Sequence, residues 1–357
     1  MKVLGLFDVR QNQTGQPVAP YSYRADLLHD FVDLKVLTPA SNPIHKKVRD
    51  VFEHRLHMPM DLALRSTSNL RDADLVFAFL EQFAIFPSAL KKRGVSGYRK
   101  KPLVALSCWW AEELATGSEE QRERIRRALE GFDGIISFSE NQRQVFEEFG
   151  YPSSRVFPVK FGVDPEYYRP NKDVPKDLEI VAAGVDRGRD YDTLARAAEL
   201  LPHRQFDVFT QVGRIKNPPK NMRVHGTVDM DTHRKNLQRA QLVVIPTHDL
   251  QYPTGQSVLL EAMACGTATA VTETDAMREY IHDSKWNFSL PLYDPERFAQ
   301  KVDQILDDQE LRLRVAAAGQ SGVLSTLNFA NTWTDVAWAF QEIVNRFQLE
   351  QSSRKFR

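Results

Sequence analysis

The sequence predicts an α/β protein built from two doubly wound domains, and three observations support this. Its 357 residues exceed the size at which a single hydrophobic core usually stops growing. Short apolar runs alternate with helix-forming segments, which is typical of parallel sheets covered by helices on both faces. The alternation occurs twice, on either side of a charged stretch from 165 to 176 that contains three prolines and no sustained apolar period.

In the first half of the chain we expect six buried strands. They are 2–8, 31–37, 73–80, 102–110, 134–139 and 156–162. Two helices are expected over 118–130 and 139–150, because each segment opens with Ser-x-x-Gln, a helix-start signal of the capping-box type. These elements predict a first domain over residues 1–164.

The second half repeats the pattern. Strands are expected at 178–184, 205–211, 222–226, 240–246 and 267–272, with helices near 191–201, 231–239, 257–265 and 275–282. From Asp294 onward the chain is expected to be helical almost to its end. The division that follows is a linker over 165–176, a second domain over 177–325 and a helical segment over 326–357, for which packing back on the first domain is one option. Two such domains would face each other across a central cleft, since parallel sheets of this kind bind ligands at the C-terminal ends of their strands.

Composition excludes several classes of protein. Lys plus Arg and Asp plus Glu both total 47, so no global charge marks the chain as a polyanion binder. Cys108 and Cys265, the only cysteines, lie in apolar runs, which argues against a disulfide framework or a cysteine zinc site. The first apolar run breaks at Asp8 and no 18 apolar residues run together, so we expect a soluble, cytoplasmic protein.

The motifs of several common enzyme classes are missing. There is no G-x-G-x-x-G after the first strand, and no P-loop, H-E-x-x-H or G-x-S-x-G pattern, so dehydrogenase, P-loop kinase, zincin and hydrolase functions lose support. The histidines do not cluster at the spacing of metal ligands, and we expect neither a metal nor a cofactor. Glu112 and Glu113 are adjacent on a predicted helix and cannot face each other as glycosidase carboxylates do.

The segment from Ile245 to Ile281 is the most informative. A buried strand ends there, a polar loop follows, and Thr254-Gly255 form a turn into a helix that Gly266 ends. Such a helix start presents unpaired backbone N–H groups and a positive dipole, which favour a phosphate or diphosphate. Glu261 lies one turn further in among apolar residues, so its carboxylate needs hydrogen-bond donors, and sugar hydroxyls could serve. The residues predicted to bind a ligand here are Thr254, Gly255, Gln256, Ser257, Val258 and Glu261.

The run Glu261-Ala-Met-Ala-Cys-Gly266 resembles the donor-binding region of family 4 glycosyltransferases, which have the GT-B fold of two facing Rossmann-like domains. Further matches follow the same order along the chain: Ser139-Glu140, Gly162-Val163-Asp164 and Asp294-Pro295-Glu296. The segment 182–194 is similar to the loop in which an Arg and a Lys clamp the donor diphosphate. There, Arg189 stands at the Lys position and Arg187 is the nearest candidate for the Arg.

One position departs from the family pattern. The family has Glu-x7-Glu, and the first acid, which contacts donor-sugar hydroxyls in the family, would fall at Pro253. The second acid, Glu261, would contact the ribose. Gln256 or Thr254 are candidates to replace the missing carboxylate, and we expect the donor-sugar specificity to differ from that of common glucose or mannose enzymes.

The resemblance implies a glycosyltransferase that uses a nucleotide-diphosphate sugar as co-substrate and retains the anomeric configuration. Arg187 and Arg189, with the helix start, have the charge needed to stabilise the departing diphosphate, which predicts transfer without a metal; Glu261 completes the predicted catalytic set. Two alternatives stay open: a sugar-nucleotide epimerase or phosphorylase on the same fold, and a non-catalytic nucleotide-sugar-binding protein.

Sequence features for the acceptor are weaker. Residues on predicted loops that could contact it are Asp8, Arg10, Tyr23, Arg24 and His248, and Trp109 at the end of a predicted strand is a further candidate. The tract from Lys91 to Lys101 holds six cations and no acid, and it could contact an anionic acceptor, a membrane or a nucleic acid, although such tracts are usually solvated surfaces.

Overall fold

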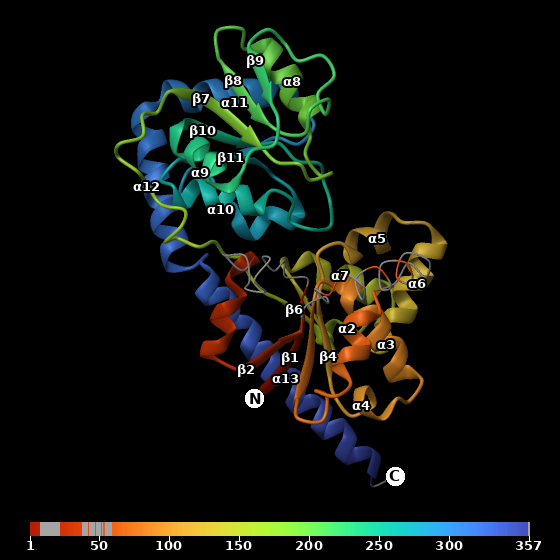
Figure 1. Cartoon of the computed structure of the whole chain (residues 1–357). Coiled ribbons are helices and arrows are strands. Elements are labelled where there is room, and N and C mark those ends of the chain that lie inside the picture. Colours follow the sequence, from red (N-terminus) through yellow and green to blue (C-terminus); the bar gives the residue numbers. More distant parts are fainter. Residues whose placement is uncertain are drawn as a thin grey trace. The chain divides into compact units, whose positions relative to one another are not determined.

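The computed structural model describes residues 1–7, 22–37, 42, 47, 51, 53 and 59–355. The chain forms two compact units (Figure 1). The first comprises Met1–Val159 together with Thr332–Arg357, and the second comprises Lys160–Asn331. Residues 165–176, the expected linker, therefore group with the second unit, and most of the last helix groups with the first.

The first unit contains a six-stranded parallel sheet in the order β2-β1-β3-β4-β5-β6. Its strands are β1 (Lys2–Leu6), β2 (Asp33–Leu37), β3 (Leu75–Phe79), β4 (Leu103–Leu106), β5 (Gly134–Ser137) and β6 (Val156–Pro158). Its helices are η1 (Ser22–Asp30), α2 (Asp61–Ser66), η2 (Glu81–Ala84), α3 (Ile85–Lys92), α4 (Ser96–Arg99), α5 (Trp110–Thr116), α6 (Glu119–Leu129), α7 (Asn141–Glu148), η3 (Ser153–Arg155) and, from Thr332 onward, α13 (Phe329–Lys355).

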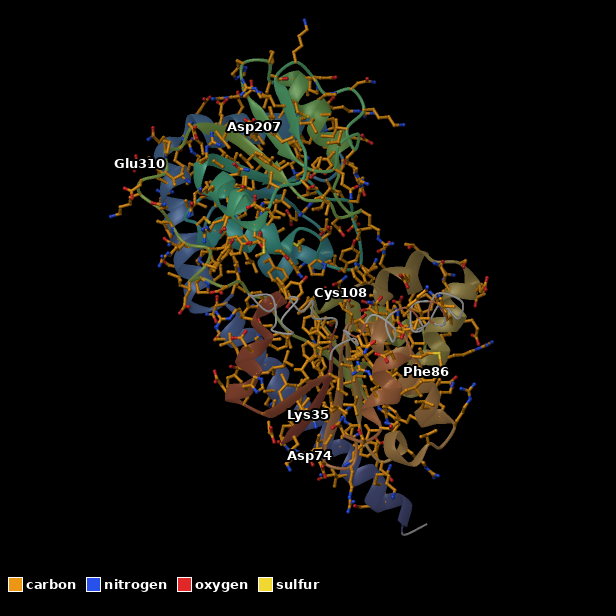
Figure 2. The ribbon with its side chains drawn as sticks, viewed as in Figure 1. Lys35, Asp74, Phe86, Cys108, Asp207 and Glu310 are labelled. Atoms are coloured by element: carbon orange, nitrogen blue, oxygen red, sulfur yellow. The ribbon has the colours of Figure 1, made fainter. Side chains whose placement is uncertain are left out.

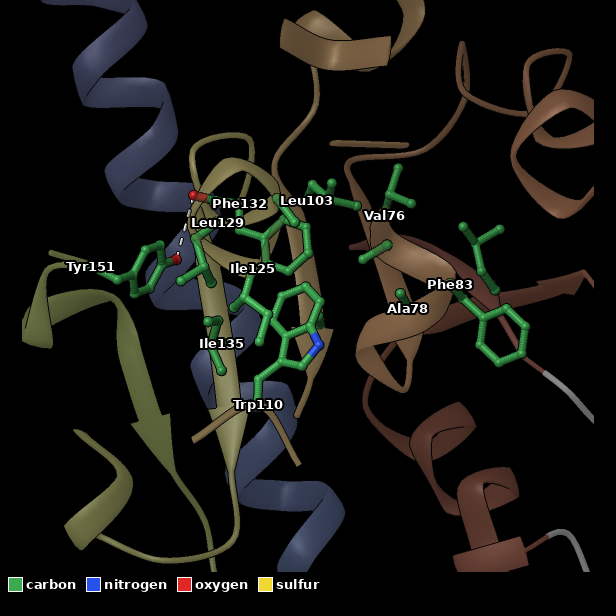
Figure 3. Packing of buried hydrophobic residues seen from close by; sticks show 14 of the residues in the cluster. Val76, Ala78, Phe83, Leu103, Trp110, Ile125, Leu129, Phe132, Ile135 and Tyr151 are labelled. Carbon is green, nitrogen blue, oxygen red and sulfur yellow. Dashed lines mark hydrogen bonds between the residues drawn. The ribbon is translucent and has the colours of Figure 1, made fainter. Parts of the chain in front are cut away.

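Both faces of this sheet are buried. On one face, Trp110 of α5 stacks on Phe132 with ring centroids 5.5 Å apart, among side chains of β3, β4, β5 and α6 (Figure 3). On the other, Phe340 of α13 packs edge-on against Phe77 at 4.9 Å. The continuous apolar runs expected for a sheet covered on both sides thus reflect its real environment.

The second unit contains a parallel sheet in the order β12-β11-β10-β7-β8-β9. Its strands are β7 (Leu178–Ala183), β8 (Phe206–Phe209), β9 (Met222–His225), β10 (Ala240–Ile245), β11 (Ala268–Thr272) and β12 (Phe288–Leu290). Its helices are α8 (Tyr191–Leu200), α9 (Met230–Arg239), α10 (Gln256–Ala264), η4 (Asp275–Tyr280), α11 (Pro295–Asp307) and α12 (Gln309–Ser325). Strand order reverses between β7 and β10, the place where such sheets bind ligands.

The expected strands all form, each within a few residues of its predicted ends, and β12 is an additional strand. The predicted capping box at Ser118 is present. The one predicted at Ser139 is wrong: α7 begins at Asn141 after Glu140, and the Ser139 hydroxyl accepts a hydrogen bond from the Gln142 side chain instead. The segment expected as a helix over 275–282 is the shorter 3₁₀ helix η4. Among the described residues, no helix combines the length and the apolar character needed to cross a membrane.

Candidate functional site

Two loops meet where the strand order of the second sheet reverses. Residues 184–190 follow β7, and residues 246–255 follow β10. A short antiparallel pairing joins them: Asp190 N donates to Pro246 O at 3.1 Å, and His248 N donates to Gly188 O at 2.8 Å. The two loops therefore form one continuous surface beside the N-terminus of α10.

Arg189 lies inside this surface rather than on it. The residue is only 5% exposed, and neither Nε nor Nη1 of its guanidinium has a hydrogen-bond partner among the residues that the structure describes. Burial lowers the pKa of Arg189, although Tyr191, Asp186 and Glu261 favour its charged form. A buried cation with unfilled donors is costly, and an anion is the kind of group that would satisfy it.

Glycine is required on both sides of that guanidinium. Gly184 and Gly255 both have positive φ, of 138° and 89°, and a Cβ at either position would collide with the Arg189 side chain. The Gly-containing turn expected from sequence thus serves close packing of an arginine as well as backbone geometry.

The N-terminus of α10 opens beside Arg189. Its N-cap is Gly255, which offers no side-chain acceptor, so the first N–H groups of the helix have no side-chain cap. Two further buried polar atoms without partners lie here, Oγ1 of Thr247 and Oε1 of Gln256. Among the described residues, Arg189, Thr247 and Gln256 thus place unsatisfied polar atoms around one helix start, a pattern expected for an anion site.

Asp186 links the two loops. Its Oδ1 accepts hydrogen bonds from Gly188 N at 2.8 Å, Thr254 Oγ1 at 2.6 Å and Tyr252 OH at 3.1 Å. Burial would raise the pKa of Asp186, but these hydrogen bonds outweigh it and the pKa is lowered. Sequence reasoning missed Asp186, because a lone acid in a polar loop belongs to no motif.

The Glu261 carboxylate already has hydrogen-bond partners within the protein. Its Oε2 lies 2.9 Å from Nε2 of His233 on α9, and Tyr168 also hydrogen-bonds to it. Burial raises the pKa of Tyr168, and the Glu261 carboxylate adds to the shift. Neither partner was predicted, since 28 residues separate His233 from Glu261 and nothing local connects them.

The other predicted donor residues take different positions. The Thr254 hydroxyl is committed to Asp186, which leaves it without a donor for a sugar. Ser257 and Val258 lie in the first turn of α10, half-buried and buried. Arg187 is exposed on its loop, where it interacts with Tyr252. Arg187 and Arg189 thus differ: one faces solvent and the other is enclosed.

The predicted acceptor residues are scattered. Tyr23 is 43% exposed, with its ring 5.8 Å from that of Phe79, and Arg24 pairs with Asp26 at 3.1 Å. Trp109 is 37% exposed just before α5. His248 lies in the second unit, its ring 5.9 Å from Tyr293. Asp8 and Arg10 lie outside the described residues.

The first unit has its own anion at a helix start, supplied by the chain. Glu81, 3% exposed, follows β3 and accepts hydrogen bonds from the backbone N–H groups of Cys108, Trp109 and Trp110, the last two at 2.8 and 3.2 Å. Burial raises the pKa of Glu81, and these N–H groups oppose it. Cys108 follows β4 (Figure 2), and burial raises the pKa of its thiol well above the ordinary value, which disfavours the reactive thiolate. The N-terminus of α5 is therefore already occupied.

Half of the cations in the Lys91–Lys101 tract serve the fold. Lys91 pairs with Asp133 and donates to Lys101 O, Lys92 pairs with Glu130, and Lys101 donates to the backbone of Ala73. Arg93, Arg99 and Lys100 are exposed, and they make no such contact with the residues that the structure describes. Within the described part of the chain, no three or more His, Cys, Asp or Glu side chains gather as metal ligands would.

Comparison with known proteins identifies similar sequences for part of this chain. Residues 214–322, which include β10 and α10, match the family model "Glycosyl transferases group 1". A phosphatidyl-myo-inositol mannosyltransferase of Mycobacterium tuberculosis is 27% identical over 182 residues, which span 49% of this chain and 44% of that protein. The match thus covers less than half the length of this curated relative.

Solved structures extend the similarity in fold to nearly the whole chain. Anabaena HepE in complex with UDP and glucose superposes with a TM-score of 0.68 at 15% identity, covering 96% of this chain and all of that one. Sucrose-phosphate synthase of Thermosynechococcus elongatus gives 0.70 at 14% identity, covering 97% and 99%. The predicted two-domain α/β architecture is confirmed as the GT-B fold, and together with the group 1 match the comparisons support a glycosyltransferase family for this chain.

Proposed function

We propose that this protein transfers a glycosyl group from a nucleoside diphosphate sugar to an acceptor, without a divalent metal and with retention of the anomeric configuration. Relatives in fold that were solved with UDP, and the group 1 match over β10 and α10, support the donor class. The observation that carries the proposal is the enclosed guanidinium of Arg189, which lies beside the uncapped start of α10 and whose Nε and Nη1 have no partner in the described part of the chain.

The charge of this site fits the chemistry of transfer. When the anomeric C–O bond breaks, negative charge grows on the departing diphosphate. Arg189 and the N–H groups of the first turn of α10 would stabilise that charge from fixed positions, in surroundings where burial strengthens electrostatic interactions. Arg187, exposed on the same loop, would add a second positive charge from the solvent side. Arg189 and the start of α10, here called the diphosphate site, would thus supply the positive charge that a divalent ion supplies in other enzymes. This is the ground for proposing metal-independent transfer.

Glu261 is proposed to bind the ribose of the donor. An ionised carboxylate has about four lone-pair sites. His233 and Tyr168 use two of them, which leaves acceptors for a ribose diol. In this arrangement, His233 and Tyr168 hold the carboxylate in place before the nucleotide arrives.

Arg189→Met tests the proposal. With UDP, GDP, ADP and dTDP as probes in titration calorimetry, we expect the native protein to bind at least one, and Arg189→Met to weaken that binding about 100-fold, because a buried charge pair is lost. Arg196→Met, which removes an exposed arginine of the neighbouring helix α8, is the matched control and should bind normally. Failure of the native protein to bind any of the four, or normal binding by Arg189→Met, would refute the proposed diphosphate site.

Product analysis tests the reaction itself. Donor incubated without acceptor should undergo only slow hydrolysis, whereas an epimerised or phosphate-cleaved sugar would favour an epimerase or phosphorylase. Turnover that persists in excess chelator, and an unchanged anomeric configuration in the product by NMR, are the expected results for the two finer parts of the proposal.

A further inference from the structure

We propose that Asp186 is a specificity-determining residue that accepts hydrogen bonds from hydroxyls of the transferred sugar. This inference rests on the proposed function and extends it to the sugar half of the donor. It starts from the position of the carboxylate, which lies on the β7 loop, half-buried, directly against the residues that lead into α10.

The two oxygens of Asp186 do different things. Oδ1 takes the three short hydrogen bonds that join the loops, from Gly188 N, Thr254 Oγ1 and Tyr252 OH. Oδ2 has only a long contact of 3.3 Å, with the same Tyr252 hydroxyl, among the residues that the structure describes. One oxygen therefore suffices for the link between loops, and the second keeps lone pairs for a ligand.

Electrostatics narrows what that ligand group can be. A carboxylate beside the diphosphate site weakens the binding of any free phosphate, because it repels the phosphate and also attracts the Arg189 cation. The hydrogen bonds to Asp186 keep its pKa below the ordinary value, so it is ionised at neutral pH and acts only as an acceptor. A neutral group rich in hydroxyl donors gains from such an acceptor. A diphosphate joined to a sugar can bind both: its phosphates at the diphosphate site and its sugar hydroxyls at the neighbouring Asp186 carboxylate.

The surrounding sequence is arranged around this carboxylate. Pro253 brings no polar side chain, while its two neighbours, Tyr252 and Thr254, both donate hydroxyls to Asp186. Burial raises the pKa of Tyr252 to about 12, so it stays a donor under all physiological conditions. The carboxylate beside the loop that follows β10 is thus Asp186, which lies on the loop that follows β7.

Asp186→Asn separates the two roles, because the amide oxygen can still accept the hydrogen bonds made to Oδ1 while the second acceptor becomes a donor. The probes are UDP, GDP and ADP, each compared with UDP-glucose, GDP-mannose and ADP-glucose in titration calorimetry. For the pair in which the sugar most improves binding to the native protein, we expect Asp186→Asn to bind the diphosphate as tightly as before or tighter. The gain due to the sugar should fall at least tenfold, which corresponds to about 1.4 kcal/mol.

Two further variants complete the experiment. Thr254→Val loosens the link between loops but keeps the carboxylate, so it should weaken diphosphate and sugar nucleotide by the same factor. Asp249→Asn removes an exposed carboxylate from the β10 loop and should change neither. The inference would be overturned if Asp186→Asn kept the full improvement in binding due to the sugar, or if it weakened diphosphate and sugar nucleotide by the same factor, as Thr254→Val should. Either result would leave the proposed diphosphate site intact. A native protein that binds no diphosphate would overturn the proposed function, and this inference with it.

Discussion

At the scale of single residues, the site is built around a cost. Arg189 is enclosed between two glycines, with two of its nitrogens unsatisfied, and burial lowers its pKa. In a protein without ligand, such a group opposes folding. Residues selected for binding often carry a cost of this kind, because the group is satisfied only when the ligand is present.

This cost makes a stability prediction. Replacing Arg189 by Met keeps much of the side-chain volume and removes the buried charge, so the ligand-free variant should be more stable than the native protein by about 1–3 kcal/mol. Urea denaturation monitored by circular dichroism measures the difference, with Arg196→Met as the control for loss of an exposed arginine. A less stable Arg189→Met would mean that the guanidinium is satisfied in the folded protein.

The residues of the site were predictable to different degrees. Arg189 was predictable because segment 182–194 resembles the loop that clamps the donor diphosphate, with Arg189 at the Lys position, and because this loop follows a strand at the ligand-binding edge of a parallel sheet. Asp186, His233 and Tyr168 were not, because their partners are distant in sequence: Asp186 meets Thr254 across 68 residues. Tertiary contacts of this range leave no periodic or local signal.

At the scale of elements, two helix starts in the chain contrast. Both α5 and α10 follow strands of parallel sheets and lack side-chain caps of their own. At α5, however, the Glu81 carboxylate accepts the backbone N–H groups of Cys108, Trp109 and Trp110. At α10 the corresponding positive end lies beside the Arg189 guanidinium, and no carboxylate of the described residues accepts its first N–H groups, so of these two helix starts only that of α10 is open to an external anion.

Glu81→Ala should therefore destabilise the first unit without affecting the donor site. Leaving several buried N–H groups without an acceptor should cost about 2 kcal/mol or more. Tryptophan fluorescence during urea denaturation suits the measurement, since four of the five tryptophans, all except Trp286, belong to the first unit. Glu120→Ala, on the exposed side of α6, is the control. Diphosphate binding should be normal in both variants, and a loss of binding in Glu81→Ala would contradict this separation of roles.

Elements were predicted best where burial shapes the sequence. Strands such as β3 and β10 read as apolar runs because helices cover both of their faces. The three-residue β12 was missed because so short a run is indistinguishable from a loop. The Ser139 prediction failed because a side-chain hydrogen bond from Gln142 competes with the cap.

At the scale of the whole molecule, the two sheets share a parallel design and differ in order. The alternation of runs predicted both sheets, but it did not predict that β7 would pair with β10, which is the pairing that brings the 184–190 and 246–255 loops together. Strand order depends on how each crossover helix packs, and local sequence patterns do not record that choice.

Because diphosphate binding is proposed for the second unit alone, the amides whose hydrogen exchange should change on binding can be predicted. With a saturating nucleoside diphosphate, the amides of Ser257 and Val258 should exchange more slowly by about tenfold or more, because the ligand accepts their hydrogen bonds and closes the local opening through which they exchange. The amides of Trp109 and Trp110 should not respond, since Glu81 accepts their hydrogen bonds with or without ligand. Arg189→Met at the same diphosphate concentration should lose the protection at α10. Protection that appears at the start of α5 instead would place the diphosphate in the first unit and remove the basis for assigning it to the second.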